Sequence, residues 1–256
     1  MKKYELTTET LQFAGRTLHR IKAVKDFDSI KAGEFGGWIE NEKNLSQDDN
    51  AWIYGDAMVF DNAKVYGNAN VSGNANVFGN ANVFGYANVS GYAKVYGNAN
   101  VFGYANVFGY AKVYGNANVS GYAKVYGNAN VSGYAEVYGN ANVFGYAKVY
   151  GDVNVSGDVN VSGNAEVSGN AKVYGNAAIK GDAKVHDAVD YIVFKNFWSS
   201  GRYFTWTSSN NKWSVGCFYG TGEELIKKAY ADSEKSGREY ERVVRYVESI
   251  LADERK

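Results

Sequence analysis

The sequence is poor in the residues that build most catalytic and cross-linked sites. Its 256 residues include one cysteine, Cys217, and two histidines, His19 and His186. A single cysteine cannot form a disulfide within the chain, and in a predicted strand it is expected to be buried. Histidine and carboxylate residues do not recur at metal-ligand spacing, and no phosphate-binding or dinucleotide-binding glycine motif is present. We therefore expect no metal and no cofactor.

Excess charge and long apolar runs are also missing. The formal net charge is zero, which argues against a nucleic-acid partner held by bulk electrostatics and against an acidic mimic of DNA. No apolar run approaches the length that spans a membrane, and the first residues lack the apolar core of a signal peptide. These features predict a protein of a reducing cytoplasm without a membrane partner.

A six-residue repeat dominates what is present. Val or Ile occupies every sixth position from Ile53 to Val185, a small residue stands two positions before it, and Gly follows two positions after nearly every one. The segment 97–102, Gly-Asn-Ala-Asn-Val-Phe, is typical. A repeat this regular predicts a repeat architecture and outweighs local propensity.

The alternation within each hexad indicates which side chains face inward. Ala99 and Val101 point to one face of a short strand, while Asn100 and Phe102 point to the other. So little inward side chain fills only a narrow interior, and each Gly supplies a turn. Three sides of six residues close a coil of eighteen, so we predict an all-β solenoid of parallel strands. Seven to eight coils would make a rod of roughly 35 Å.

The segments on either side of the repeat lack its period. Residues 1–50 are expected to form an N-terminal cap and a first coil, residues 51–185 the β-helix, and residues 186–256 a small α+β module. This module is predicted to hold three strands, at 191–197, 202–207 and 212–218. Two helices are expected after it, with capping boxes that begin at Thr221 and Ser236.

The opening of the repeat is its most specific part. The stretches 18–21, 31–40, 45–47 and 51–55 resemble the start of the YdcK-like bacterial and prophage hexapeptide-repeat proteins, and the resemblance covers roughly residues 4–185. It implies a left-handed parallel β-helix and a bacterial or phage origin. These relatives are catalogued as acyltransferases on their fold alone, and fold does not establish a reaction.

Acyltransferases of this class use a histidine general base and a loop extruded from the β-helix. The rod from 51 to 185 has no insertion, and His186 lies where the β-helix is expected to end. A capping role is favoured for His186 and a structural role for His19, so no catalytic residue is assigned. The sequence disfavours an enzyme without excluding one.

Outward aromatic side chains recur every eighteen residues and are expected to stack along the rod. A contact surface between copies of the chain is one interpretation, because large apolar patches are seldom left in water. The alternative is that the stacks only stabilise coil packing. The predicted interface, for which a trimer is favoured, comprises Phe60, Phe78, Tyr96, Tyr114 and Tyr150.

The C-terminal module has a second group of aromatic and cationic residues. Such residues suit stacking on a base and pairing with a phosphate, an interface between proteins, or the core of a small domain. The predicted ligand-binding residues are Trp198, Ser199, Arg202, Trp206, Lys212 and Trp213.

Three functions from different classes follow. The leading hypothesis is a non-enzymatic phage or prophage binding protein, with the β-helix as a rigid assembly scaffold and end modules that recognise a partner. The second is an anti-defence sponge that sequesters a host nucleotide signal. The third is an acyltransferase with an atypical site at His186. The expected partners are other copies of the chain, and a small nucleotide or a host protein.

Overall fold

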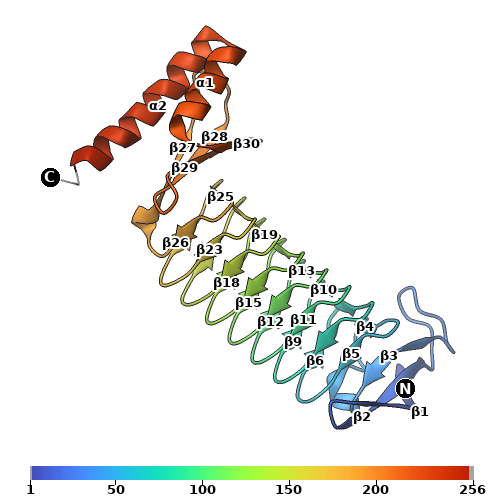
Figure 1. Ribbon diagram of the computed structural model, residues 1–256. Helices are drawn as coiled ribbons and strands as arrows, with labels where there is room; N and C mark the ends of the chain where they lie inside the picture. The colour runs from blue at the N-terminus through green and yellow to red at the C-terminus, as the bar shows by residue number, and fades with distance from the viewer. Residues whose placement is uncertain (1, 254–256) are drawn as a thin grey trace.

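The computed structural model describes residues 2–253, and it is a straight rod with a different cap at each end (Figure 1). The rod is a parallel β-helix of about eight coils with three strands to a coil. Strands one coil apart pair in register eighteen residues apart, as Asn100 pairs with Asn118 and Val101 with Val119. The predicted all-β solenoid is confirmed, while its handedness stays the expectation that the resemblance gives.

Each flat side of the rod is a separate parallel sheet. The long sheet contains β5 (Met58–Val59), β8 (Asn76–Val77), β11 (Lys94–Val95), β14 (Lys112–Val113), β17 (Asn130–Val131), β20 (Lys148–Val149), β23 (Glu166–Val167) and β26 (Lys184–Val185). The eight-stranded sheet contains β4 (Trp52–Ile53), β7 (Asn70–Val71), β10 (Asn88–Val89), β13 (Asn106–Val107), β16 (Lys124–Val125), β19 (Asn142–Val143), β22 (Asn160–Val161) and β25 (Ala178–Ile179). The seven-stranded sheet contains β6 (Lys64–Val65), β9 (Asn82–Val83), β12 (Asn100–Val101), β15 (Asn118–Val119), β18 (Glu136–Val137), β21 (Asn154–Val155) and β24 (Lys172–Val173).

The interior of the rod consists of the two small positions of each hexad. Ala99 and Val101, like their equivalents in the other coils, have no exposed surface. Two hexads carry Val in place of Ala, at Val153 and Val159. The preceding turn glycines, Gly151 and Gly157, have φ of 91° and 83°, whereas Gly97 has 72°. The turn backbone therefore changes slightly where the inward side chains are larger.

Turn glycines are needed for conformation and for space. Gly97 has a positive φ, and a Cβ there would lie 3.0 Å from the backbone nitrogen and oxygen of Gly115 in the next coil. Any side chain would both strain the turn and separate the coils.

The outward asparagines form columns that differ in their hydrogen bonds. Asn70, Asn88 and Asn106 are in register, and the Asn88 and Asn106 amides donate to the carbonyls of their own turns. Side-chain bonds between coils instead join other columns, for example from Asn80 to Asn98 at 3.0 Å.

The N-terminal segment extends the long sheet and covers the open end of the rod. A hairpin of β1 (Tyr4–Phe13) and β2 (Arg16–Ala23) pairs with β3 (Phe35–Ile39), which then pairs in parallel with β5. The short 3₁₀ helix η1 (Glu42–Asn44) follows. Leu45 and Ile53 are eight residues apart, two more than the repeat. Ile39, Leu45 and Ile53 stack on Val59, Val65 and Val71, so this displacement is absorbed by the bend before β4.

Lys3 connects the N-terminal cap to the start of the β-helix through buried hydrogen bonds. Its ammonium donates 2.8 Å hydrogen bonds to the carbonyls of Asp49 and Ala51, and its side chain is only 1% exposed. Burial lowers the pKa of Lys3 to about 8, because the charged form is poorly solvated there, although Asp49 opposes the shift. Tyr4 donates to the Leu45 carbonyl at 2.7 Å beside it.

The C-terminal module differs from the prediction in its strands. After the 3₁₀ helix η2 (Ala188–Asp190) it has four antiparallel strands, β27 (Tyr191–Lys195), β28 (Tyr203–Thr207), β29 (Lys212–Val215) and β30 (Phe218–Gly220). The predicted third strand is two strands, because Gly216 takes a positive φ of 56° and reverses the chain. Cys217 lies in this turn and is exposed, so its predicted burial is wrong.

Two helices pack on the far side of this terminal sheet (Figure 1). Helix α1 (Gly222–Asp232) begins at the predicted capping box of Thr221 and Glu224. Helix α2 (Glu234–Asp253) begins earlier than the predicted box at Ser236, since Ser233 accepts a hydrogen bond from the Ser236 amide.

The other side of the terminal sheet rests on the last coil. Thr205 of β28 accepts a 2.9 Å hydrogen bond from the Ala178 amide of β25. Asp182 accepts hydrogen bonds from Asn210 and Tyr219, which lowers the pKa of Asp182. Both faces of the terminal sheet are therefore covered, one by helices and one by the rod.

Candidate functional site

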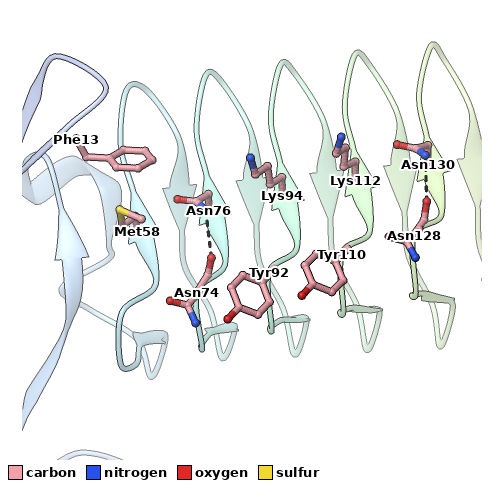
Figure 2. Close-up of a pocket in the computed structure, with 10 residues that line it drawn as sticks. All are labelled: Phe13, Met58, Asn74, Asn76, Tyr92, Lys94, Tyr110, Lys112, Asn128 and Asn130. Carbon is pink, nitrogen blue, oxygen red and sulfur yellow. Dashed lines mark hydrogen bonds between the residues drawn. The ribbon is translucent and has the colours of Figure 1, made fainter.

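A groove lies on the outward side of the long sheet, which we call the long face. It has a volume of about 630 Å³ and crosses β5, β8, β11, β14 and β17 (Figure 2). Its lining residues are Phe13, Met58, Asn74, Asn76, Tyr92, Lys94, Tyr110, Lys112, Asn128 and Asn130. The turn of the β1–β2 hairpin places Phe13 at one end, so a segment remote in sequence completes the groove.

Two lysines form the middle of the groove floor. Lys94 and Lys112 are directly opposite one another on β11 and β14, and adjacent strands are about 4.8 Å apart. Like charges in this position repel. Among residues 2–253 no carboxylate lies within ion-pair distance of either, whereas Lys148 on the same face pairs with Glu166 at 3.1 Å. The groove therefore has two adjacent positive charges to offer to an anion.

Asn76 is the buried polar residue of the groove. Its side-chain nitrogen donates to the Asn74 carbonyl at 3.1 Å, but its oxygen Oδ1 has no hydrogen-bond partner among the described residues. The residue is only 9% exposed and lies next to Lys94 in register. A buried carbonyl oxygen without a donor is costly, so a ligand donor that reached this atom would satisfy it.

Two tyrosines border the lysines. The rings of Tyr92 and Tyr110 are parallel, with centroids 5.0 Å apart. Each ring covers one face of the other, so their edges and hydroxyl groups are what they mainly present to solvent. Both side chains are more than half exposed. Figure 2 shows them along one border of the groove, beside the strands that carry the lysines.

The predicted interface residues form the expected stack in part. Phe60, Phe78, Tyr96 and Tyr114 stack face to face with centroids 4.9–5.1 Å apart, and burial raises the pKa of Tyr96. Phe60 is only 4% exposed, because Phe13 and the Arg16 guanidinium cover it. Tyr150 stands apart from the stack, beyond Ser132, and is 38% exposed.

The predicted ligand-binding residues do not share one pocket. Trp206 and Trp213 are 3% and 2% exposed and belong to the core beneath α1 and α2, which contradicts their prediction as ligand contacts. The Trp206 indole nitrogen donates to Asn211 at 2.9 Å. Phe204 and Trp206 lie on the same face of β28, and the helices cover that face.

The other four predicted residues lie on the module's surface. Trp198 is 65% exposed, and Ser199 bonds to the Asn196 side chain through both its amide and its hydroxyl. Arg202 is exposed. Lys212 lies over the Tyr219 ring. These contacts separate Trp198 and Ser199 from Lys212.

Trp198 instead belongs to an apolar groove of about 470 Å³ on the outer side of α2. We call it the terminal groove, and it is lined by Phe194, Trp198, Glu239, Arg242, Val243 and Tyr246. The sequence did not indicate it, because Phe194 and Trp198 are brought to α2 only by the fold of the module.

The two histidines lie at opposite ends of the rod. The Nδ1 atom of His186 is 2.5 Å from the hydroxyl of Ser168, whose residue is only 2% exposed. The His186 backbone amide donates to Asp190. His19 lies on β2, with Nδ1 3.4 Å from the Thr7 carbonyl. His186 thus follows the last strand of the rod and contacts Ser168 of the preceding coil.

The described residues 2–253 hold neither a candidate metal centre nor a candidate membrane-spanning helix. They contain no cluster of three or more His, Cys, Asp or Glu side chains arranged to hold a metal ion. Neither α1 nor α2 combines the length and apolar character needed to cross a membrane.

Comparison with known proteins finds a partial similarity. No family model matches the chain. Over 62 residues the chain is 39% identical to a protein of Escherichia coli K12 named "Uncharacterized acetyltransferase YdcK". The match covers 21% of this chain and 19% of that protein, so it spans about a fifth of the relative. The hexad repeat, the parallel β-helix and this similarity together fit the hexapeptide-repeat β-helix family.

Proposed function

Taking the chain as a hexapeptide-repeat β-helix protein, we propose that it is a non-enzymatic binding protein. The β-helix is the rigid scaffold, and the groove of the long face is its ligand-binding surface. The observation that carries this proposal is the unpartnered oxygen of Asn76, which lies buried at the groove floor beside Lys94.

A rigid surface favours binding because little conformational entropy is lost when the ligand arrives. The floor residues lie on strands whose backbone is hydrogen-bonded to neighbouring coils. For example, the backbone amide of Lys94 donates to the Ala111 carbonyl, and that of Lys112 donates to the Ala129 carbonyl. Their inward neighbours are fully buried alanine and valine. The backbone that carries the groove side chains is therefore fixed before any ligand binds.

Recognition of a partner by the end modules is the second part of the leading hypothesis. The terminal groove supports it, since Trp198 and Tyr246 are large, exposed aromatic residues beside an Arg. The phage setting remains an expectation from the resemblance. The nucleotide-sponge alternative loses two of its proposed contacts, because Trp206 and Trp213 are in the core.

Acetyl transfer is the other candidate function, and the printed name of the E. coli relative favours it. In this chain His186 is the histidine that such a reaction would use. Purified protein incubated with acetyl-CoA and amine or hydroxyl acceptors is expected to release no free CoA above background. Turnover that His186→Ala abolishes would replace the binding function with this one.

Binding in the groove is tested by calorimetry against a panel of small ligands. The panel contains acidic and neutral oligosaccharides, cyclic dinucleotides, ADP-ribose and acetyl-CoA. At least one of them is expected to bind the unmodified protein and to lose that binding in the double variant Lys94→Gln, Lys112→Gln.

The matched control is Lys64→Gln with Lys124→Gln, which removes two exposed lysines from the other two sides of the rod. Binding that survives the groove variant but is lost in Trp198→Ser would move the site to the terminal groove. That result would contradict the proposal.

A further inference from the structure

The groove of the long face is complementary to a ligand that carries two kinds of group. The Asn76 oxygen needs a hydrogen-bond donor, and Lys94 and Lys112 need acceptors that carry negative charge. Asn76 and Lys94 are neighbours in register, so the donor and the anionic group must be about one strand spacing apart, roughly 5 Å.

The shape of the groove favours an elongated ligand. Its floor runs along the rod through Met58, Asn76, Lys94, Lys112 and Asn130, each from a successive coil. Four strand spacings give a length of roughly 20 Å. Phe13 closes only one end (Figure 2), so a chain of linked units can enter from the other end.

The two tyrosines favour a ligand with hydroxyl groups over a ligand with flat nucleobases. Tyr92 and Tyr110 already stack on each other with an interplanar angle of 4°, so the space between them is not open to a nucleobase. Their hydroxyl groups, with the side-chain amides of Asn74, Asn128 and Asn130, donate and accept hydrogen bonds along the groove. A nucleic-acid backbone is usually bound by many Lys and Arg residues. This groove has two lysines, and the chain has zero net charge, so a nucleic-acid ligand is disfavoured.

We propose that the groove binds an acidic oligosaccharide that lies along the rod, with its acid groups at Lys94 and Lys112. A sugar hydroxyl donates to the Asn76 oxygen. This inference rests on the proposed function of the groove and adds the chemical class of the ligand. The acid group is a carboxylate of a uronic acid or a sulfate ester, since both accept hydrogen bonds from an ammonium group.

Calorimetry of the full chain with defined probes tests the ligand class. The probes are tetragalacturonate, a sulfated tetrasaccharide, neutral maltotetraose, oligothymidylate and oligoglutamate. One of the two acidic saccharides is expected to bind, and which of them binds more tightly identifies the acid group. Neutral maltotetraose is expected to bind at least about tenfold more weakly, because it forms no charge-assisted hydrogen bond with Lys94 or Lys112. Oligothymidylate and oligoglutamate are also expected to bind more weakly, because neither places sugar hydroxyl groups beside its acid groups to donate to the Asn76 oxygen.

Variants connect the binding to the groove. Lys94→Gln with Lys112→Gln is expected to weaken the acidic saccharide about tenfold or more, while Lys64→Gln with Lys124→Gln leaves affinity unchanged. Asn76→Leu is expected to weaken binding severalfold with little change in the thermal midpoint of the free protein, because removal of an unpartnered buried oxygen offsets the lost hydrogen bond to the Asn74 carbonyl.

The outcomes separate the two proposals. Groove-dependent binding of oligothymidylate, oligoglutamate or any other panel ligand that equals or exceeds the affinity of the acidic saccharides would overturn the ligand class and keep the groove as a binding surface. Equal affinity of the groove variant and the unmodified protein for every probe that binds, or no binding by any acidic saccharide, would overturn this inference.

Discussion

Val101→Asp tests the division of each hexad into inward and outward positions. Val101 has no exposed surface and stacks between Val83 and Val119 of the neighbouring coils. Removing a buried valine side chain forgoes about 1.5–3 kcal/mol of burial. A carboxylate in its place has no partner, which brings the expected loss of stability to about 3–5 kcal/mol.

The neighbouring position supplies the matched control. Asn100 is half-buried on the outward side, and its amide donates to Asn118 at 3.0 Å. Asn100→Asp adds the same charge where water can reach it, so its cost is expected to stay within about 1 kcal/mol. The comparison therefore isolates burial from charge.

Lowering the pH should reduce the loss of stability caused by Val101→Asp. Burial raises the pKa of the introduced carboxyl group above its unfolded value, so the folded variant retains a proton that the unfolded chain releases. The destabilisation is then present at neutral pH and diminishes as pH falls below the folded pKa.

Urea unfolding followed by circular dichroism measures both variants, with hydrogen exchange to detect local opening, because repeat arrays need not unfold in one step. Equal stability of Val101→Asp and Asn100→Asp would refute the inward assignment of Val101. A defect that is the same at acidic and neutral pH would refute the account of its cause.

Three further predictions concern the caps and assembly. Because Lys3 has a folded pKa of about 8 against 10.5 for the unfolded value, the folded chain releases its proton first, so its contribution to the free energy of unfolding rises between these pH values. The contribution of Lys3 should rise by at most about 1.4 kcal/mol per pH unit. Urea titrations should show this rise in the unmodified protein relative to Lys3→Met, and identical pH profiles of the two proteins would contradict it. Gly181→Ala is expected to loosen the C-terminal module, since the new Cβ would lie 2.1 Å from the Tyr219 hydroxyl oxygen; limited proteolysis should then cleave near residue 186, and unchanged resistance would count against this docking. Light scattering is expected to give a homo-oligomer, with a trimer favoured, and a concentration-independent mass of 28.0 kDa would exclude assembly; because Phe60 and Phe78 lie beside Asn76 and Lys94, an interface at these rings is expected to compete with the groove ligand.

The rod was predictable because its energetics are local and repeated. Ala and Val at fixed intervals define the interior, and the eighteen-residue period puts Lys94 opposite Lys112. The offset between Leu45 and Ile53 was also readable, since the valine column resumes in register after it.

The caps and the groove were less accessible to sequence reasoning because they depend on distant contacts. Phe13 reaches the long face only through the fold of the hairpin. Trp206 and Trp213 were ambiguous, because burial of both sheet faces follows from docking the module on the last coil. The unpartnered oxygen of Asn76 follows from local geometry that residue type cannot indicate.

The most direct test of ligand binding in the groove is an NMR titration with the acidic tetrasaccharide that binds in calorimetry. The account predicts that the side-chain amide of Asn76 and the ring signals of Tyr92 and Tyr110 shift together and saturate with the calorimetric affinity. Shifts confined to Phe194, Trp198 and Tyr246 of the terminal groove, with Asn76 unmoved, would contradict it.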